Sequence, residues 1–279
     1  MSEIIKTDLQ RQITKRSNDL VYASYDLSAI SQDILQCVIS QIKDEDTHLN
    51  SYRFTIRDLE KRLTAGSGYE RRIREKNLIK ARKELMSAQI VFKSSNGTVD
   101  CFSWCSRFSY NISEKWIEVE LHNSLNNYLI NVVKNAKFTL VENKYFLPLK
   151  SAYSKRLYMI LKNKLDIAVA TNKKVGQYKT SVNNLTETLV IPDSFKSNFF
   201  DLKKRVLLVA MQQINEHTDI EIDFETEKEG RKVKNIIFSV KSKGFKKEKR
   251  AKKTYKKDYT SNPSSKSGVE ALNEWLNKD

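Results

Sequence analysis

Two copies of one structural unit are predicted along this chain, because the same order of elements occurs twice. Apolar residues at helical and strand spacing predict helix, strand, short helix, long helix and hairpin at 28–43, 52–56, 57–63, 69–87 and 89–110. The same order is predicted again at 149–165, 177–180, 182–189, 198–217 and 219–240. Leu59 precedes Ile90 by 31 residues and Leu185 precedes Ile220 by 35, so the spacing nearly repeats as well. The segment 122–148 joins the copies.

Local signals define several boundaries in the first copy. Ser28 is a suitable N-cap for the first helix. The pair Asn96-Gly97 predicts a tight turn between strands at 89–93 and 99–110, because both residues tolerate positive φ. A third strand at 116–121 is expected to complete a small sheet. The long helix at 69–87 follows a glycine-rich turn, and its outer face carries Arg71, Arg72, Arg74, Lys76, Lys80, Arg82 and Lys83.

The second copy is similar but has a longer hairpin. Ser181 caps its short helix and Pro192 follows that helix as a stop. The inner face of the long helix at 198–217 is predicted from Leu202, Val206, Val209, Ala210 and Ile214. Near its start this helix exposes Lys203, Lys204 and Arg205. Around the turn of the hairpin lie Lys228, Arg231, Lys232 and Lys234.

Two helices followed by a twisted hairpin form the winged-helix arrangement. Its long helix can lie in the major groove, about 12 Å wide, while the hairpin places cations against the flanking phosphates. Any one of these charged helices could be an ordinary solvated face, but the duplication, the hairpins and the net charge together favour DNA binding. We therefore predict an α+β protein with an N-terminal winged-helix domain at 1–135, a C-terminal winged-helix domain at 136–240 and a basic tail at 241–279.

The net charge points to a polyanionic partner. The chain has 50 Lys and Arg residues against 34 Asp and Glu, a formal charge of +16. The segment 241–279 holds twelve of the cations against five carboxylates, a net of +7, and the other 240 residues carry +9. Because this segment lacks apolar periodicity, we expect a disordered arm that adds affinity for DNA without specificity. A merely solubilising tail is one alternative, and a small helix that docks a host protein through Ala271, Leu272, Trp275 and Leu276 is another.

The sequence gives no sign of catalysis, of a metal or of another cofactor. It has no His-x-His pair and no Gly-x-x-x-x-Gly-Lys phosphate loop. Cys101 and Cys105 lie four residues apart on one predicted strand without a second pair of ligands, so buried thiols are expected rather than zinc. Tyr153 and Tyr158 are expected to belong to the core and surface of one helix. An odd number of cysteines, no signal peptide and no apolar run longer than six residues indicate a cytoplasmic protein.

Several ordered blocks of sequence resemble the initiator replication protein family of theta-replicating plasmids, whose tandem winged-helix domains bind iterons. The block at 16–28, Arg-Ser-Asn-Asp-Leu-Val-Tyr-Ala-Ser-Tyr-Asp-Leu-Ser, resembles the N-terminal signature of the family. The block at 149–158 resembles the start of its second domain, 200–207 and 214–220 resemble its second recognition helix, and 230–233 resembles the following wing. The resemblance covers about residues 15–240 and leaves the tail out.

This resemblance implies an origin-binding protein rather than an enzyme. Members of the family bind direct repeats in double-stranded DNA as monomers, help to melt an adjacent AT-rich region and recruit the host helicase machinery. Their dimers commonly repress the initiator's own gene. The resemblance therefore implies DNA, a second copy of the chain and host replication proteins as partners.

We expect DNA contacts from four groups of residues. In the first domain, Ser67 caps the long helix against a phosphate and its neighbours extend the contact: Tyr69, Arg71, Arg72, Arg74, Lys80 and Lys83. At the start of the second domain, residues expected to position the backbone are Ser151, Tyr153, Lys155 and Arg156. Residues expected at the groove are Ser197, Asn198, Lys203, Lys204 and Arg205. The wing contributes Lys228, Arg231, Lys232 and Lys234.

Two other functions are compatible with the sequence. A winged-helix transcription regulator would use the same motifs, although a tandem duplication within one chain favours direct repeats over a palindrome. A basic RNA- or ribosome-associated structural protein is suggested by the tail, but the chain lacks the Gly-Phe-aromatic blocks of proteins that read single-stranded RNA. Footprinting on duplex DNA with direct repeats separates the three.

Overall fold

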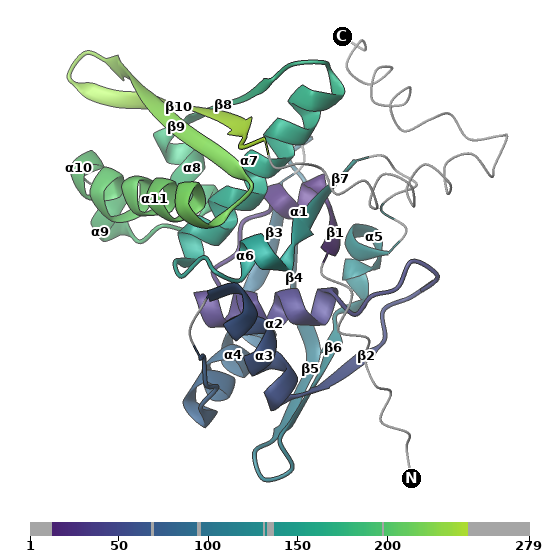
Figure 1. Cartoon of the computed structure of the whole chain (residues 1–279). Coiled ribbons are helices and arrows are strands. Elements are labelled where there is room, and N and C mark those ends of the chain that lie inside the picture. Colours follow the sequence, from purple (N-terminus) through teal and green to yellow (C-terminus); the bar gives the residue numbers. More distant parts are fainter. Residues whose placement is uncertain are drawn as a thin grey trace, which may run out of the picture.

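Two three-stranded antiparallel sheets, each accompanied by helices, organise the protein (Figure 1). The computed structural model describes residues 13–244 apart from 68–69, 94–95, 131, 133–136 and 197; at 65–67 it describes the backbone alone. Most of the predicted basic tail, from residue 245 onward, lies outside this range, and its disorder stays a prediction. Within the described part of the chain, no helix combines the length and the apolar character needed to cross a membrane.

The first half follows the predicted order of elements, with additions before and within it. These elements are β1 (Ile13–Ser17), α1 (Asn18–Tyr22), α2 (Ala29–Ile39), β2 (Ser51–Thr55), α3 (Ile56–Ser67), α4 (Glu75–Ser87), β3 (Gln89–Lys93), β4 (Val99–Ser103), β5 (Cys105–Asn111) and β6 (Trp116–Leu121). The linking region holds a 3-10 turn (Asn123–Leu125), α5 (Asn126–Leu129), β7 (Phe138–Glu142) and α6 (Asn143–Phe146).

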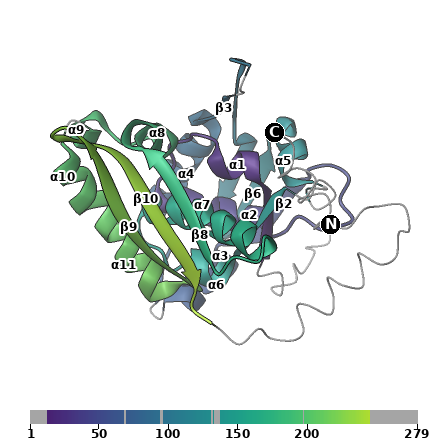
Figure 2. The ribbon, with the colours of Figure 1, turned by 90° about the horizontal axis from the view of Figure 1, so that it is seen from above.

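The second half repeats the pattern. Its elements are α7 (Ala152–Ala170), β8 (Val175–Ser181), α8 (Val182–Thr188), α9 (Asp193–Lys196), α10 (Phe199–Leu202), a π-helical turn (Lys203–Leu207), α11 (Leu208–His217), β9 (Ile220–Glu229) and β10 (Lys232–Ser242). Helix α10, the π turn and α11 follow one another without a break, so the long helix predicted at 198–217 is confirmed. Figure 2 shows β9 running beside this long helix.

The two larger sheets have the same strand order, β2-β6-β5 in the first half and β8-β10-β9 in the second. In the first sheet β2, between α2 and α3, pairs with β6. In the second sheet β8, between α7 and α8, pairs with β10 in the same way. The sequence of elements and the pairing of strands therefore agree between the halves. The predicted α+β class and the two tandem winged-helix units are confirmed.

The hairpin of the first unit consists of different strands from those that the sequence predicts. The predicted strand at 99–110 is two strands: β4 pairs only with β3, and β5 pairs with β6 in the other sheet. Trp104 separates them, because its fully buried ring packs edge-on against Tyr25 with the centroids 4.9 Å apart. The wing of the first unit is thus β5–β6, and the β3–β4 hairpin, with Gly97 at positive φ as predicted, is an insertion.

This break also corrects the interpretation of the cysteines. Cys101 lies on β4 and is exposed, whereas Cys105 lies on β5 and is buried. The two thiols therefore do not share a strand face, and only one of them is a buried thiol. Burial raises the pKa of the Cys105 thiol to about 12, so this side chain stays protonated and apolar in character.

The start of the long helix in the first unit also differs from the prediction. Helix α3 continues to Ser67, and α4 begins only at Glu75, so residues 70–74 are extended. The backbone N–H of Arg71 donates to Thr64 Oγ1 and that of Ile73 to Glu60 Oε1, at 3.0 and 2.7 Å. These side-chain acceptors compete with helical hydrogen bonds. Arg71, Arg72 and Arg74 consequently precede the helix instead of lining its outer face.

Both predicted N-cap serines lie at helix starts, but they act differently. Ser181 Oγ accepts a hydrogen bond from the N–H of Asn184 at 3.1 Å, as an N-cap does. Ser28 precedes α2, but its Oγ donates instead to Glu84 Oε2 of α4 at 2.7 Å. Hydrogen bonds from Ser28 and Ser31 hold the pKa of Glu84 below its usual value despite partial burial. Ser28 therefore links two helices instead of capping one.

A cluster of buried charges joins the two halves. Asp33 of α2 and Lys155 of α7 have fully buried side chains, and Asp33 Oδ1 lies 2.6 Å from Lys155 Nζ. Arg71 approaches the same carboxylate at 3.2 Å, and Lys155 also donates to the carbonyl oxygen of Phe146. Burial raises the pKa of Asp33 and lowers that of Lys155, while each partner opposes the shift in the other. Each partner therefore offsets part of the cost of burying the other.

Strand pairing adds a second connection between the start of the chain and the linking region. β1 pairs antiparallel with β7, from Ile13 opposite Glu142 to Ser17 opposite Phe138. Residues 138–142, which the sequence analysis places in the second domain, therefore form a sheet with the N-terminal strand. The boundary between residues 135 and 136 remains our proposed division of the chain.

We predict that Lys155→Ala lowers the free energy of unfolding by about 3–5 kcal/mol, because it leaves the buried Asp33 carboxylate short of a partner. Chemical denaturation of the full chain measures this loss. Lys203→Ala removes the same side chain from an exposed position and should stay within about 0.5 kcal/mol of the unsubstituted protein. A loss below about 1 kcal/mol for Lys155→Ala would contradict a structural role for the pair.

Candidate nucleic-acid interface

The N-terminal part of the long helix in the second unit carries a compact group of exposed cations. Lys203, Lys204 and Arg205 are all exposed and all lie in the π-helical turn. Arg205 pairs with Asp201 at 3.3 Å, and its guanidinium lies 5.3 Å from the Phe195 ring centroid. The two lysines thus present their charge outward, while Arg205 is held against its own helix.

The opposite side of this helix fixes it to the domain. Leu202, Val206, Ala210 and Ile214 are buried as predicted, whereas Val209 is only half-buried. Asn198 lies at the N-cap and its Oδ1 accepts from the N–H of Phe200 at 2.9 Å. The other expected residue at this end, Ser197, lies outside the described residues. A buried stripe and a capped end hold the cationic face in a defined orientation.

The wing of the second unit, the hairpin β9–β10, lies beside this helix (Figure 1). Gly230 adopts a φ of +61° at the tip, a backbone conformation that residues with a Cβ rarely adopt. The cations around the tip are all exposed: Lys228, Arg231, Lys232 and Lys234. Lys234 pairs with Glu229 at 2.7 Å, which moderates its charge. Helix and wing together form the geometry that a winged-helix domain uses on duplex DNA.

The expected cations of the first unit separate into two groups. Arg74, Lys80 and Lys83 are exposed on or just before α4, with Lys80 3.7 Å from Glu84. Arg72 is exposed and pairs with Glu70 at 3.2 Å. Arg71 instead points inward to Asp33 and is half-buried, so it does not belong to the exposed cations, and its contact with DNA stays a prediction. Ser67 does not cap α4 as predicted, because it ends α3, and the N-cap of α4 is Arg74. Tyr69 and the side chain of Ser67 lie outside the described residues.

The residues expected at the start of the second domain serve mainly to hold the fold together. Lys155 is buried against Asp33, and Arg156 is buried beneath the Tyr25 ring and donates to the carbonyl oxygen of Ala23. Contact of these two side chains with phosphates is therefore ruled out in this structure. Ser151 is the N-cap of α7, and Tyr153 is half-buried.

Helix α7 is linked to the long helix by one side chain. Gln213 Oε1 accepts hydrogen bonds from the backbone N–H groups of Lys150 and Ser151 at 2.9 and 3.1 Å. The contact sets the start of α7 against α11. Ser151 thus contacts the long helix through its backbone N–H, a contact that any residue type except proline could make and that the sequence therefore does not predict.

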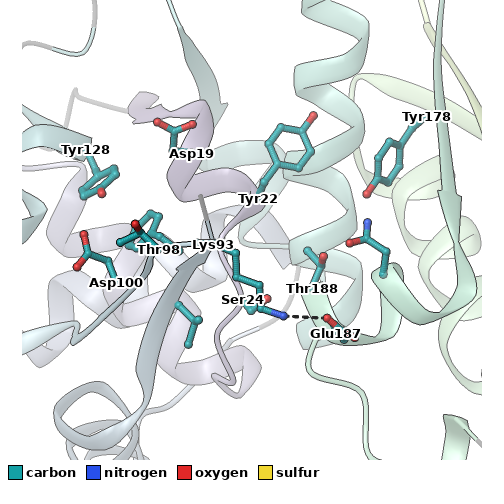
Figure 3. Close-up of a pocket in the computed structure, with 14 residues that line it drawn as sticks. Asp19, Tyr22, Ser24, Lys93, Thr98, Asp100, Tyr128, Tyr178, Glu187 and Thr188 are labelled. Carbon is teal, nitrogen blue, oxygen red and sulfur yellow. Dashed lines mark hydrogen bonds and ion pairs between the residues drawn. The ribbon is translucent and has the colours of Figure 1, made fainter. Parts of the chain in front are cut away.

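A cavity of about 530 Å³ lies where the β3–β4 hairpin meets the second unit (Figure 3). Lys93 and Glu187 form an ion pair of 3.0 Å across it. The rest of its polar lining consists mostly of phenols and carboxylates, from Asp19, Tyr22, Asp100, Tyr128 and Tyr178. Burial raises the pKa of both Tyr22 and Tyr178, which keeps these phenols neutral. The exposed cations of the long helix and of the wing are not among the residues that line this cavity.

The two tyrosines considered as possible nucleophiles, Tyr153 and Tyr158, both pack within the fold. Tyr158 is fully buried and its hydroxyl donates to Asp219 Oδ1 at 3.0 Å, while Lys162 Nζ lies 2.7 Å from Oδ2. Tyr153 lies one turn earlier and packs against the core. In the part of the chain that the structure describes, no group of three or more His, Cys, Asp and Glu side chains is placed to hold a metal ion.

Comparison with known proteins identifies related families and structures. Residues 13–162 match the family model described as "Initiator Replication protein, WH1", and residues 181–240 match "Initiator Rep protein, WH2". An uncharacterized 27.6 kDa protein of Escherichia coli is 23% identical over 234 residues, which are 80% of this chain and 93% of that protein. The crystal structure of Pi initiator protein in complex with iteron DNA is similar with a TM-score of 0.62 and 19% identity, covering 84% of this chain and 99% of that one. At this identity the structural match supports the fold.

We predict that Lys203→Ala and Lys204→Ala each weaken binding to a preferred duplex by about 1–3 kcal/mol if the side chain meets a base, with relaxed specificity at that base pair. A phosphate contact would instead weaken binding to every sequence alike. Gel-shift titrations on the preferred and on scrambled duplexes measure both effects. Lys174→Ala, in the exposed α7–β8 loop, is the charge-matched control. Equal affinities for both variants and the control would remove this helix from the reading role.

Proposed function

Because the chain belongs to the initiator replication protein family, we propose that it is a plasmid replication initiator that binds direct repeats in duplex DNA at the origin. The observation that carries this proposal is the family match across both winged-helix units. The Pi initiator protein, of similar fold, was crystallised with iteron DNA, which supports repeats of that kind as the target. Binding, rather than catalysis, is the activity that we assign to the chain.

The second unit supplies most of the sequence reading in this proposal. Its long helix lies in a major groove with the exposed Lys203 and Lys204 facing the DNA, and its wing lies along the neighbouring phosphates. The first unit uses α4 and the preceding Arg72 and Arg74 in the same manner. A tandem pair in one chain reads two segments in the same direction, which suits direct repeats.

The later steps of initiation extend the same proposal. We assign to the bound protein the melting of an AT-rich region, the recruitment of host helicase or initiator proteins, and repression of its own gene by a dimer. A target on plasmid DNA places the protein in the bacterial cytoplasm. A transcription regulator with the same two units is the alternative, and it would lack a requirement for DNA melting.

We expect one protein molecule to protect roughly 20 bp, because two long helices on one face of the duplex lie about one helical turn apart. DNase I footprinting on duplex DNA carrying direct repeats measures the span, and a duplex with one repeat inverted is the control. Protection of only about 10 bp per molecule would mean that the first unit is not on the DNA. Equal protection of scrambled DNA would contradict the proposed function itself.

The wing is expected to position the protein without selecting its sequence. Arg231→Ala and Lys232→Ala should each lower the slope of log affinity against log salt by about 0.9, because each lost phosphate contact releases one counterion fewer. The loss should be the same on preferred and scrambled duplexes. Titrations between low and moderate salt give the slope, with Lys174→Ala as the reference. If Arg231→Ala altered sequence preference at an unchanged slope, the wing would be reading bases.

A further inference from the structure

One large apolar side chain is displayed on the cationic end of the long helix. Phe200 is the second residue of α10 and is 65% exposed, more than any other large hydrophobic side chain that the structure describes. Its neighbours Phe195 and Phe199 are partly buried and pack against the core. Phe200 therefore points outward, whereas the two neighbouring phenylalanine side chains do not.

The backbone that carries Phe200 is held in place. Asn198 Oδ1 accepts from the Phe200 N–H at 2.9 Å, and Asn198 Nδ2 donates to Asp201 at 3.3 Å. Leu202, two residues later, is fully buried and anchors the same turn. A ring on a fixed backbone loses little conformational freedom when a ligand covers it, which favours its use as a contact.

Cations lie next to the ring on the same face. Lys204 follows by one turn, with its Nζ 6.0 Å from the Phe200 ring centroid, and Lys203 is exposed beside it. The two lysines attract this end of the helix to a polyanion, and the phenyl ring then approaches the same surface. Since the first residues of a recognition helix are those that reach base edges, the ring enters the groove before the rest of the helix.

Among the groups that base pairs present in the major groove, the C5-methyl of thymine is the apolar one. The other groups are hydrogen-bond donors and acceptors, which a phenyl ring cannot satisfy. We propose that Phe200 recognises a thymine by packing against its methyl group. This inference rests on the proposed function, because it requires the long helix to lie in the major groove of a preferred sequence.

The test removes the methyl group from one thymine at a time. A duplex preferred by the full chain is first obtained by in vitro selection from random duplexes. Each thymine in it is then replaced by deoxyuridine, which keeps the base pairing and loses only the methyl. Affinities are measured for the unsubstituted protein, Phe200→Ala and Val169→Ala. Val169 is the matched control, since it is an apolar side chain 52% exposed on α7.

At one thymine, deoxyuridine should weaken binding of the unsubstituted protein about fourfold, the affinity equivalent of one apolar carbon removed from water. Phe200→Ala should bind the thymine duplex correspondingly less well and show no further loss with deoxyuridine there. Val169→Ala should behave as the unsubstituted protein does. Because Phe200 is exposed, the melting temperature of Phe200→Ala should be unchanged, which excludes unfolding as the cause of its weaker binding.

Three results would overturn the inference. If no thymine position shows a deoxyuridine effect that depends on Phe200, the ring does not read a methyl. If Phe200→Ala weakens binding equally to every duplex, thymine and deoxyuridine alike, the ring wedges between base steps or contacts the sugar instead. If Phe200→Ala binds all duplexes as tightly as the unsubstituted protein, the ring serves a protein partner. A selection that yields no preferred sequence would refute the proposed function together with this inference.

Discussion

The buried ion pair between Asp33 and Lys155 is the contact on which the relative placement of the two winged-helix units depends. It joins α2 to α7 with both side chains removed from water, and Arg71 adds a second cation from the segment before α4. A lone charge in this position would be strongly unfavourable, so each unit supplies what the other requires. The pairing of β1 with β7 and the contact of Arg156 with Tyr25 strengthen the same junction. As a result, α4 and the long helix of the second unit belong to one body, and in the proposed function they meet the duplex in a set arrangement.

This arrangement gives each unit a different role. The second unit carries a long helix with a buried stripe, a capped start and a π-helical turn that displays Lys203 and Lys204. A π turn inserts one residue and so rotates the side chains before it relative to those after it, and such turns are frequent at functional sites. The first unit carries a shorter helix whose preceding arginines are partly committed to internal pairs. We therefore propose that the second unit does most of the sequence reading, and that the first unit and the wings add contacts that orient the chain.

Local patterns in the sequence predicted most of the fold. Apolar periodicity gave the helices, Ser181 and Asn96-Gly97 gave a cap and a turn, and the repeated order of elements gave the two winged-helix units. The errors arose where a distant partner decides the outcome. Trp104 ends a strand because Tyr25 lies against it. Arg71 precedes the helix because its N–H bonds to Thr64, and its side chain turns inward to Asp33, 38 positions earlier in the chain. Lys155 and Arg156 look like surface cations in an amphipathic helix, yet Asp33 and Tyr25 of the other unit cover them. Helix α2 contained a sign of such partners. It is rich in apolar residues, so its polar residues were candidates for burial against polar groups elsewhere in the chain: Ser31, Gln32, Asp33 and Gln36.

The most direct test of the account is the affinity of the full chain for a preferred repeat in which five base pairs are inserted between the contacts of the two units. Half a turn of DNA moves the second contact to the opposite face of the duplex. Because the Asp33–Lys155 pair fixes the units relative to one another, we predict that affinity falls to the level of one unit alone. The footprint should contract to one side of the insertion at the same time. An unchanged affinity, with protection on both sides of the insertion, would contradict a jointly bound pair of winged-helix units.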